Sequence, residues 1–572
     1  MACTIFPFLW SGKEGCASTM QEKSKFSWHC VHLALPLSVE MRRLLFFLTC
    51  VVLLSWVAVA QDGPFEAPIN KQVRLDSTNL PIVWINLQGA SVNLTTRVTA
   101  RMTILDNGEG RMNYADTVAH PGQHIDYRGY IGIRYRGNTS FSYSAKKPYS
   151  FRPLDKPLEE GGDWKKVSLL GMGKDSKWIL LAPYNDKSMM RDMFTFEVAR
   201  PWMDYTPDGR YCEVLVNNVY YGVFILTEQV SQGKYRLNLN DPGSDGETLM
   251  GGFLMEVDRD DEPTYTSKHF PRYSNGRKIT SRVVKYQYKY PDYEDLTPEQ
   301  LEGIHSDIDR WEDVLDSDDF LDPERGYRNY MDPMSFIDYQ LAQELSHNVD
   351  GYRLSGKFYK NRDAADPRFK VVLWDMNIGY GNVNYYDGWS TSGWIYQYND
   401  ILRPKAVMNL VPFWWYKLNS DPEYTKQLKA RWAQYRRSNL SDEAWVATID
   451  SISTLLTSGG AEYRNTQAYP KWGEYVWPNY YIASDFADEI AYLKNWIAER
   501  IAWMDEQLEF DPTAVDPIVG DVNGDGEVNI ADVNAIIDVI LGGEKLPAAD
   551  VNGDGEINVA DVNAELDIIF GL

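Results

Sequence analysis

The chain has 572 residues and a formal net charge of −24, with 81 acidic and 57 basic side chains. A negative surplus of this size repels a phosphate backbone, which argues against nucleic acid as a partner. Hydrophobic residues make up 44% of the chain, so it can bury a sizeable core, and its length suggests about two to four domains.

The N-terminal part carries a predicted export signal. Met41-Arg42-Arg43 precede a mostly apolar run over 44–57, and Ala58-Val59-Ala60 supplies a small-x-small cleavage site before Gln61. The alternative is a cytoplasmic tail before a membrane anchor, but the apolar run is short for a membrane span. We therefore expect a secreted, extracellular or cell-surface protein with no membrane span after cleavage. The predicted segments are an over-long gene start at 1–40, a signal peptide at 41–60 and an N-terminal segment at 61–79.

Cysteine usage fits export. Four of the five cysteines precede the predicted cleavage site, so the mature chain keeps only Cys212 and can form no intramolecular disulfide. Cys212 lies in the apolar run 211–216, and we expect it to be a buried small hydrophobic residue rather than a nucleophile.

Hydrophobic periodicity predicts a β-rich region followed by a helical region. Strands are expected at 80–85, 98–105, 130–136, 178–183, 212–216, 221–227 and 251–257, with one helix over 188–198. From Pro298 onward the pattern favours helices, at 298–315, 333–345, 424–438, 442–456 and 482–508. Within this second region, one hairpin is expected from strands at 358–360 and 369–374.

Two aspartates flank that hairpin. Asp350 precedes it and Asp375 follows it, so both carboxylates should lie at the same end. Phosphoryl transfer needs such a pair, because one carboxylate accepts the proton of the attacking hydroxyl and another holds the magnesium that bridges the nucleotide phosphates. The alternative is that both residues cap strands or turns. Asp375 has few such uses, since it directly follows an apolar strand and precedes glycine-rich chain.

A loop in the β-rich region offers groups that can hold phosphates. It runs through Arg136-Gly137-Asn138-Thr139-Ser140 and is soon followed by Lys146-Lys147-Pro148-Tyr149. Glycine, hydroxyl groups and cations close together are typical of an anion site. The alternative is a basic surface turn on an acidic protein.

These motifs together resemble the spore-coat H (CotH) kinase family. The resemblance rests on the two stretches of this loop, on Tyr221-Gly222-Val223-Phe224-Ile225-Leu226-Thr227-Glu228, and on Asp350 with Trp374-Asp375. It covers a predicted kinase domain at 80–510. The fold that it implies is α+β and protein-kinase-like, with a β-rich N-lobe and a helical C-lobe.

The resemblance also implies roles for single residues. Asp350 would be the catalytic aspartate and Asp375 the magnesium ligand. Lys146 or Lys147, with Arg136, would bind the phosphates of ATP. Glu228 would orient that lysine.

One position departs from the family pattern. Where many members carry an asparagine as the second metal ligand, this chain has Ser355. A hydroxyl can bind magnesium, but more weakly, and Asn377 is the candidate that would compensate.

The C-terminal sequence contains a repeat with a period of 29 residues, after a predicted linker at 511–519. Residues 521–532 and 550–561 both carry oxygen-bearing side chains at loop positions 1, 3, 5, 9 and 12 and glycine at position 6. This spacing is typical of a calcium loop, with Asp in place of Glu at position 12, and a disordered acidic tail would not keep it twice. The predicted calcium residues are Asp521, Asn523, Asp525, Glu527, Asn529 and Asp532 in the first loop, and Asp550, Asn552, Asp554, Glu556, Asn558 and Asp561 in the second.

Each calcium loop leads into one apolar helix, expected at 533–541 and 562–570. The pair resembles a small all-α dockerin module over 520–572. The family role of that module is calcium-dependent docking to a cohesin.

The leading hypothesis is an exported atypical kinase that transfers the γ-phosphoryl group of a nucleotide to a protein Ser or Thr and is tethered by a dockerin. Its expected cofactors are Mg²⁺ and Ca²⁺, with ATP as substrate. Ser355 leaves a second hypothesis open, a non-catalytic surface scaffold whose pseudokinase lobe binds protein or glycan through its aromatic residues. A third is an accessory protein of polysaccharide degradation, although no glycosidase carboxylate pair can be assigned.

Overall fold

The computed structural model describes residues 69–242, 250–362, 364–402, 408–513, 520–543, 546–552 and 556–570. The predicted gene start and signal peptide, most of the linker and Asp554 lie outside these ranges. Within them, a β-rich N-terminal region precedes a helical C-terminal region, in the order that the sequence predicts.

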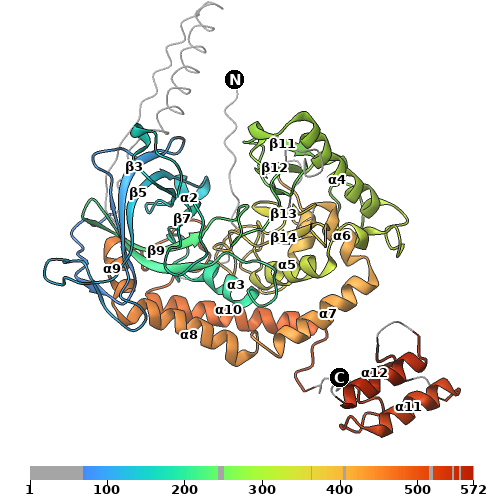
Figure 1. Cartoon of the computed structure of the whole chain (residues 1–572). Helices are drawn as coiled ribbons and strands as arrows, with labels where there is room; N and C mark the ends of the chain where they lie inside the picture. The colour runs from blue at the N-terminus through green and yellow to red at the C-terminus, as the bar shows by residue number, and fades with distance from the viewer. Residues whose placement is uncertain are drawn as a thin grey trace, which may run out of the picture. The chain divides into compact units, whose positions relative to one another are not determined.

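Seven strands of the N-terminal region close into a barrel, in the order β2-β3-β5-β6-β7-β9-β8 (Figure 1). The parallel pairing of β2 with β8 closes the ring, so the barrel has no unpaired edge. The strands are β2 (Ile82–Asn86), β3 (Val98–Leu105), β5 (Ile125–Tyr135), β6 (Tyr149–Leu154), β7 (Trp178–Leu181), β8 (Gly209–Val216) and β9 (Val219–Glu228). Two short strands, β1 (Ser77–Thr78) and β4 (Asn113–Tyr114), pair with each other.

Alternate side chains of the barrel strands fill its interior. On β6, Tyr149 and Phe151 join the inner core, so Ser150 and Arg152 face outward, as the period of two requires. Cys212 is fully buried in the same core, and burial raises the pKa of its thiol to about 12. It is therefore a small core residue, as predicted.

A second sheet has five antiparallel strands in the order β11-β12-β10-β13-β14. They are β10 (Phe253–Val257), β11 (Thr264–Thr266), β12 (Lys285–Tyr290), β13 (Gly356–Lys360) and β14 (Lys370–Val372). The β13–β14 hairpin is the one that the sequence predicts between the two aspartates. Its second strand ends at Val372, and Leu373 and Trp374 leave the sheet to pack in the core.

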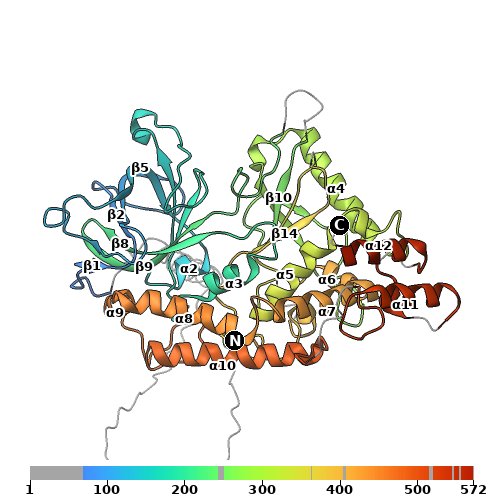
Figure 2. The ribbon, with the colours of Figure 1, turned by 60° about the horizontal axis from the view of Figure 1, so that its bottom comes forward.

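Helices dominate after residue 298. They are α4 (Pro298–Asp316), α5 (Pro333–Ser346), α6 (Phe413–Asn419), α7 (Pro422–Arg436), α8 (Asp442–Ser458), α9 (Ala461–Ala468) and α10 (Phe486–Gln507). α4, α5 and α7 each begin with a proline behind a capping side chain, Thr297, Asp332 and Asp421 respectively. α8 and α10 lie side by side in both views (Figures 1 and 2).

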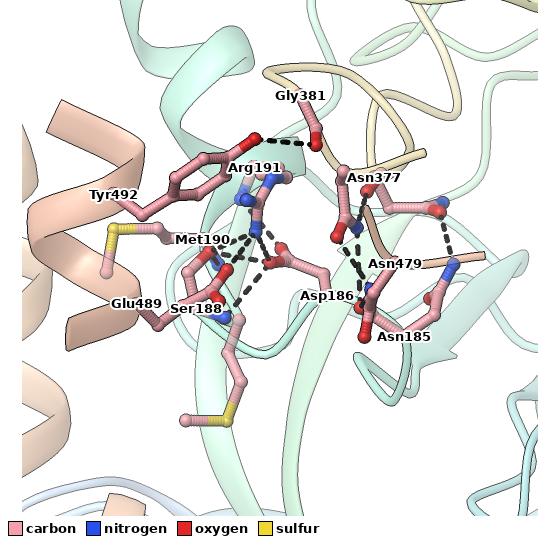
Figure 3. Close-up of polar contacts among 12 residues, drawn as sticks. Asn185, Asp186, Ser188, Met190, Arg191, Asn377, Gly381, Asn479, Glu489 and Tyr492 are labelled. Atoms are coloured by element: carbon pink, nitrogen blue, oxygen red, sulfur yellow. Dashed lines mark hydrogen bonds and ion pairs between the residues drawn. The ribbon is translucent and has the colours of Figure 1, made fainter. Parts of the chain in front are cut away.

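One buried ion cluster joins the barrel to the helical region. Arg191 opens α3 (Arg191–Ala199), the helix between β7 and β8, and its guanidinium is completely buried. It lies 2.5 Å from Asp186, in the loop after β7, and 2.9 Å from Glu489 on α10 (Figure 3). Because a buried charge is stable only when it is paired, this contact fixes the loop, α3 and α10 together.

The C-terminal module, described by itself, contains α11 (Ile530–Ile540), the turn η5 (Pro547–Ala549) and α12 (Val559–Phe570). Both helices begin three residues earlier than expected. The cause is visible in α11, where the Asn529 side chain accepts a hydrogen bond from Ala531 and caps the helix. A small core includes Val522, Ile536 and Ala549.

Across the described ranges, no helix combines the length and the apolar character that a membrane span requires.

Candidate active site

The structure brings Asp350 and Asp375 together at one end of the β13–β14 hairpin. Asp375 remains accessible to solvent. The surrounding protein nevertheless removes part of its hydration, which raises the pKa of its carboxyl. The charge of Asp350 also raises this pKa, whereas Arg136 lowers it. Two carboxylates that disfavour each other's charge in this way favour a bound cation.

Asp375 has a left-handed backbone, with φ of 63°, and several contacts hold it there. Its carbonyl accepts a hydrogen bond from the Asn348 side chain at 3.1 Å. The next backbone N–H, that of Met376, donates to the Asp192 carboxylate at 2.7 Å. Asp192 lies on α3 next to Arg191, so the buried ion cluster also positions the Asp375 turn.

The two predicted auxiliary metal ligands both contact Asp375. The Ser355 hydroxyl donates to its carboxylate at 3.3 Å, and the Asn377 amide nitrogen donates to the other oxygen at 2.6 Å. With its nitrogen turned this way, Asn377 directs its oxygen toward Asn185, at 3.4 Å (Figure 3). Asn382 and Asn479 continue this network and hold the Asn185 backbone carbonyl.

The donor set fits magnesium that is shared with a nucleotide. Among the described residues, no three His, Cys, Asp or Glu side chains converge into a closed metal cage. Magnesium commonly keeps several waters and uses one or two protein carboxylates together with substrate phosphates. Asp375, with the hydroxyl of Ser355 beside it, offers this kind of open site.

The two carboxylate oxygens of Asp350 differ in their hydrogen bonding. Arg353 donates to its Oδ1 at 2.6 Å, while Oδ2 has no hydrogen-bond partner within the part of the chain that the structure describes. A quarter of the side chain is exposed. A general base needs this arrangement, in which one oxygen fixes the carboxylate and the other can accept a proton.

The barrel contributes Arg136 to the site. Arg136 follows β5 and lies over the Trp374 ring, 5.3 Å from its centroid. Burial lowers the pKa of its guanidinium, whereas Asp375, Glu256 and Asp192 raise it. Its side chain makes no hydrogen bond within the described residues, so its N–H groups can donate hydrogen bonds to a phosphate.

The two predicted lysines have other partners. Lys146 is buried and donates to the Val223 carbonyl and, at 3.0 Å, to Asn465 on α9. Lys147 donates to the Phe141 carbonyl, and burial lowers its pKa to about 8. Lys146 therefore fastens the loop to β9 and α9 instead of facing Asp375.

Glu228 does not orient Lys146. Its carboxylate pairs with the buried guanidinium of Arg236 and accepts a hydrogen bond from Tyr205 at 2.9 Å. Glu228 is five residues beyond Val223 on β9, which at about 3.3 Å per residue is roughly 16 Å along the strand. The lysine–glutamate pair expected from the resemblance is thus replaced by two separate contacts.

Sequence reasoning missed a cluster of cations on the outer face of the barrel, formed by Arg97, Arg134, Arg152 and Lys177. The pKa of Arg97 falls to about 9 because of burial and the neighbouring Arg134 and Arg152. None of the four forms an ion pair among the described residues, and the buried Nε atoms of Arg134 and Arg152 have no hydrogen-bond partner. Arg134 also lowers the pKa of Arg136, so the cluster continues toward Asp375. The missed signal was the spacing of two residues between Arg134, on β5, and Arg136, just after it, which strand alternation would place on one side.

The first calcium loop folds around its own carboxylates. Asp521, at position 1, accepts hydrogen bonds from the backbone N–H groups of Asp525 and Gly526, and Gly526 has φ of 87°. Asp532, at position 12, reaches back to the N–H groups of Val522, Asn523 and Asn529 at 2.8–3.0 Å.

The described part of the second loop repeats this pattern. Asp561, again at position 12, accepts from the N–H groups of Asn552 at 3.2 Å and Asn558 at 2.8 Å. In both loops the carboxylate at position 12 therefore reaches back to backbone N–H groups of its own loop.

Comparison with known proteins identifies the larger domain. A model of the CotH kinase protein family matches residues 133–504, more than half of the chain. The chain belongs to the CotH kinase family. A Dockerin type I domain model matches residues 519–564, and no curated protein matches the chain.

These matches confirm the family resemblance and its C-terminal module. The CotH match begins inside β5, at residue 133, so it includes Arg136, Asp350 and Asp375. Dockerin domains bind calcium and typically bind cohesins, and proteins that carry them are typically extracellular or at the cell surface. The CotH family suggests ATP and magnesium as ligands of the larger domain.

Asp192 gives the CotH domain a pH-dependent stability that can be measured without any ligand. Burial, and next the charge of Asp375, raise its pKa to about 8, whereas an unfolded Asp titrates near pH 3.9. The folded state therefore binds an extra proton between about pH 4 and 8, and the free energy of unfolding falls as pH rises through that interval. Asp192→Asn should not lose stability in this way, because its amide does not titrate. The difference in free energy of unfolding between the variant and the parent should therefore shift in favour of the variant from pH 5 to pH 8, as measured by denaturant unfolding in EDTA.

Two further variants complete this test. Asp192→Ala leaves the Met376 N–H unpaired and should cost about 1–3 kcal/mol. Asp318→Asn, at an exposed site, should change little at either pH. If Asp192→Asn and Asp318→Asn responded equally to pH, Asp192 would not be the titrating group.

Proposed function

We propose that the CotH domain is an active kinase that transfers the γ-phosphoryl group of ATP to a Ser or Thr hydroxyl of a protein substrate. The observation that carries this proposal is that Arg136, which follows barrel strand β5, lies over the ring of Trp374 and interacts electrostatically with the next residue, Asp375. A nucleotide phosphate between them would meet a cation on one side and a magnesium-binding carboxylate on the other.

Each residue has a distinct role in this proposal. Asp350 would accept the proton of the acceptor hydroxyl through its open oxygen, and Arg353 would hold it in place. Asp375, with Ser355 or Asn377, would bind magnesium, which when bound neutralises phosphate charge. Arg136 would hold a phosphate oxygen in place of the predicted lysines.

The arginine cluster supports a nucleotide as the missing partner. Arg97, Arg134 and Arg152 lie close together and form no ion pair among the described residues, although Asp175 and Asp292 act on Arg152 at longer range. Like charges repel, and partial burial strengthens that repulsion. A polyanion bound along this face would relieve it, and a nucleoside triphosphate supplies the required charge next to Asp375.

The second candidate function is a non-catalytic scaffold with a pseudokinase domain. The observation that favours it is Ser355, which offers a weaker magnesium ligand than asparagine. A role as an accessory protein in polysaccharide degradation has less support, because no feature of the active site favours it.

We further propose that the protein is exported and tethered through its dockerin. Calcium would fold the loops at 521–532 and 550–561, and the module would then dock to a cohesin. The support is the repeated ligand spacing together with the predicted signal peptide, which would be removed before Gln61.

Substitutions of the two aspartates should separate binding from turnover. Asp375→Asn should abolish the magnesium-dependent rise in melting temperature that ATP causes, because the metal loses its carboxylate. Asp350→Asn should keep that rise but lower phosphate transfer by about a hundredfold or more. Binding is measured by thermal unfolding with and without magnesium, and transfer with radiolabelled ATP and casein or the protein itself.

Matched variants test the other assignments. Arg136→Met should weaken nucleotide binding, whereas Lys147→Met should retain it. Ser355→Asn should raise the activity if the site is a weakened kinase. If Asp350→Asn transferred phosphate as fast as the parent, Asp350 would not be the base. If ATP with magnesium did not raise the melting temperature of the parent, the scaffold function would be favoured.

Calcium should fold the isolated C-terminal module, residues 520–572. The first loop carries three aspartates, at positions 1, 5 and 12, and their mutual repulsion would oppose loop closure unless a divalent cation neutralises it. The helices, 11 and 12 residues long, are too short to be stable alone. Calcium should therefore raise the helical circular dichroism of the module, a chelator should reverse this, and Asp521→Ala with Asp550→Ala should abolish it. Equal helicity with and without calcium would contradict the calcium assignment.

A further inference from the structure

A pocket of about 380 Å³ lies beside the segment that carries Asp350, and the kinase chemistry does not use it. Its volume is within the range of small-molecule sites. The lining combines the rings of Trp389 and Trp394 with carboxylates, hydroxyl groups and one amide. The polar members used below are Asp387, Ser390, Ser392, Gln397 and Asp400.

Buried groups from α5 and α10 fix the backbone of this pocket. Arg500 on α10 donates to the carbonyls of Thr391 and Gly393, at 3.2 and 2.8 Å. Glu344 on α5 accepts from the N–H groups of Ile395 and Tyr396, at 2.8 and 3.0 Å. Both Arg500 and Glu344 are fully buried, so the lining loop is held in place before any ligand arrives.

The floor of the pocket is a neutral histidine. His347 ends α5, and its Nδ1 lies 2.5 Å from the Ser390 carbonyl, which can only accept, so Nδ1 carries the hydrogen. Its Nε2 then accepts from the Tyr398 hydroxyl at 3.1 Å. Burial, and next the charge of Arg500, hold the pKa of His347 well below its usual value, so the ring brings no positive charge to the pocket.

The donors and acceptors of the lining point to one class of ligand. Among the lining residues that the structure describes, none is a lysine or an arginine, so these residues bring no cation to attract a phosphate or a carboxylate. Asp387 and Asp400 accept hydrogen bonds, whereas Gln397 and the two serines can donate as well as accept. Sugar hydroxyl groups both donate and accept, and the C–H faces of a sugar ring pack on aromatic rings.

Aromatic rings continue beyond the pocket as two stacked pairs. Trp389 stacks on Tyr480, with ring centroids 5.1 Å apart, and Tyr385 stacks on Trp477 at 6.1 Å. The two segments run side by side, because the Asn384 N–H donates to the Pro478 carbonyl at 2.9 Å. Tyr480 is half exposed and Trp477 is 36% exposed. Both rings are exposed enough to contact a sugar unit, and the ring of Trp477 also contacts Tyr143, with centroids 4.9 Å apart.

We propose that this pocket and the two aromatic pairs bind a carbohydrate, with one sugar between Trp389 and Trp394 and further units over Tyr480 and Trp477. A cationic side chain is the main competing occupant, since it would also suit two carboxylates and aromatic faces. A cationic side chain, however, accepts no hydrogen bond, so it would leave the donors of Gln397 and the two serines unused. The proposal concerns binding alone and does not depend on phosphoryl transfer.

Isothermal titration of the full chain with cello-, xylo-, manno- and chito-hexaose tests this proposal, and a lysine-rich peptide serves as the competing probe. At least one hexasaccharide should bind, and Trp394→Ala should weaken it at least tenfold. Asp387→Asn, a conservative change at an exposed position, should weaken it several-fold without affecting folding. Tyr463→Ala, which removes an exposed ring on α9, is the matched control and should leave binding unchanged.

The outcomes are distinct. Failure of every hexasaccharide to bind would overturn the proposal, as would saccharide binding that survives both pocket variants. Binding of the peptide instead, lost in Asp387→Asn, would assign the pocket to a cationic segment and would also overturn it. The magnesium-dependent thermal shift with ATP, measured on the same samples, reports the kinase site separately and verifies that each variant is folded.

Discussion

The buried guanidinium of Arg191 is the contact on which the site depends. It is paired with Asp186, in the loop after β7, and with Glu489 on α10, so it links the barrel to the helical region. Removing one member of such a cluster would leave an uncompensated buried charge, which typically costs about 3–5 kcal/mol. The next residue, Asp192, holds the Met376 N–H and with it the turn of Asp375. The position of a proposed metal ligand is therefore set by a charge cluster that never meets solvent.

The second organising feature is the separation of charge between the two sides of the site. Arg136 interacts with the Asp375 carboxylate at the end of the β13–β14 hairpin, and next to it an arginine cluster without ion pairs among the described residues lies on the outer face of the barrel. Asp350 is paired with Arg353, whereas the hydrogen-bond partners of the Asp375 carboxylate within the described residues are the neutral side chains of Ser355 and Asn377. A magnesium–nucleotide complex would bring a cation to Asp375 and an anion to the arginines, which supports the proposed phosphoryl transfer over a passive scaffold.

The sequence predicted what depends on local pattern. Strand alternation and the 29-residue repeat are short-range features, and the structure contains the corresponding strands and the helices that follow the two loops. Helices begin at Pro298 and Pro333 as predicted, whereas α7 begins at Pro422, two residues before its predicted start. The aspartates could be paired from sequence because a short hairpin leaves its two ends adjacent. Cys212 was correctly predicted to be a core residue because most of its neighbours in 211–216 are apolar.

The sequence could not predict which long side chains meet across the fold. Lys146 looked like a phosphate ligand, but the approach of α9 gives it Asn465 as a partner. Glu228 forms an ion pair with Arg236, which lies eight residues later in the loop after β9. Asp192 and the arginine cluster were missed for the same reason, because their neighbours come from distant segments. Met376 approaches Asp192 from the chain after β14, and the barrel brings the arginines together.

In the proposed function, Asp375 and Arg136 hold one magnesium–nucleotide complex between them. A crystal structure with Mn²⁺ and a non-hydrolysable ATP analogue can show this, because manganese gives an anomalous signal that locates the metal. We expect a peak at about 2.1–2.2 Å from the Asp375 carboxylate, as for a magnesium-like ion, with a phosphate oxygen within hydrogen-bond distance of Arg136. A nucleotide bound elsewhere, or a metal that does not touch Asp375, would contradict it.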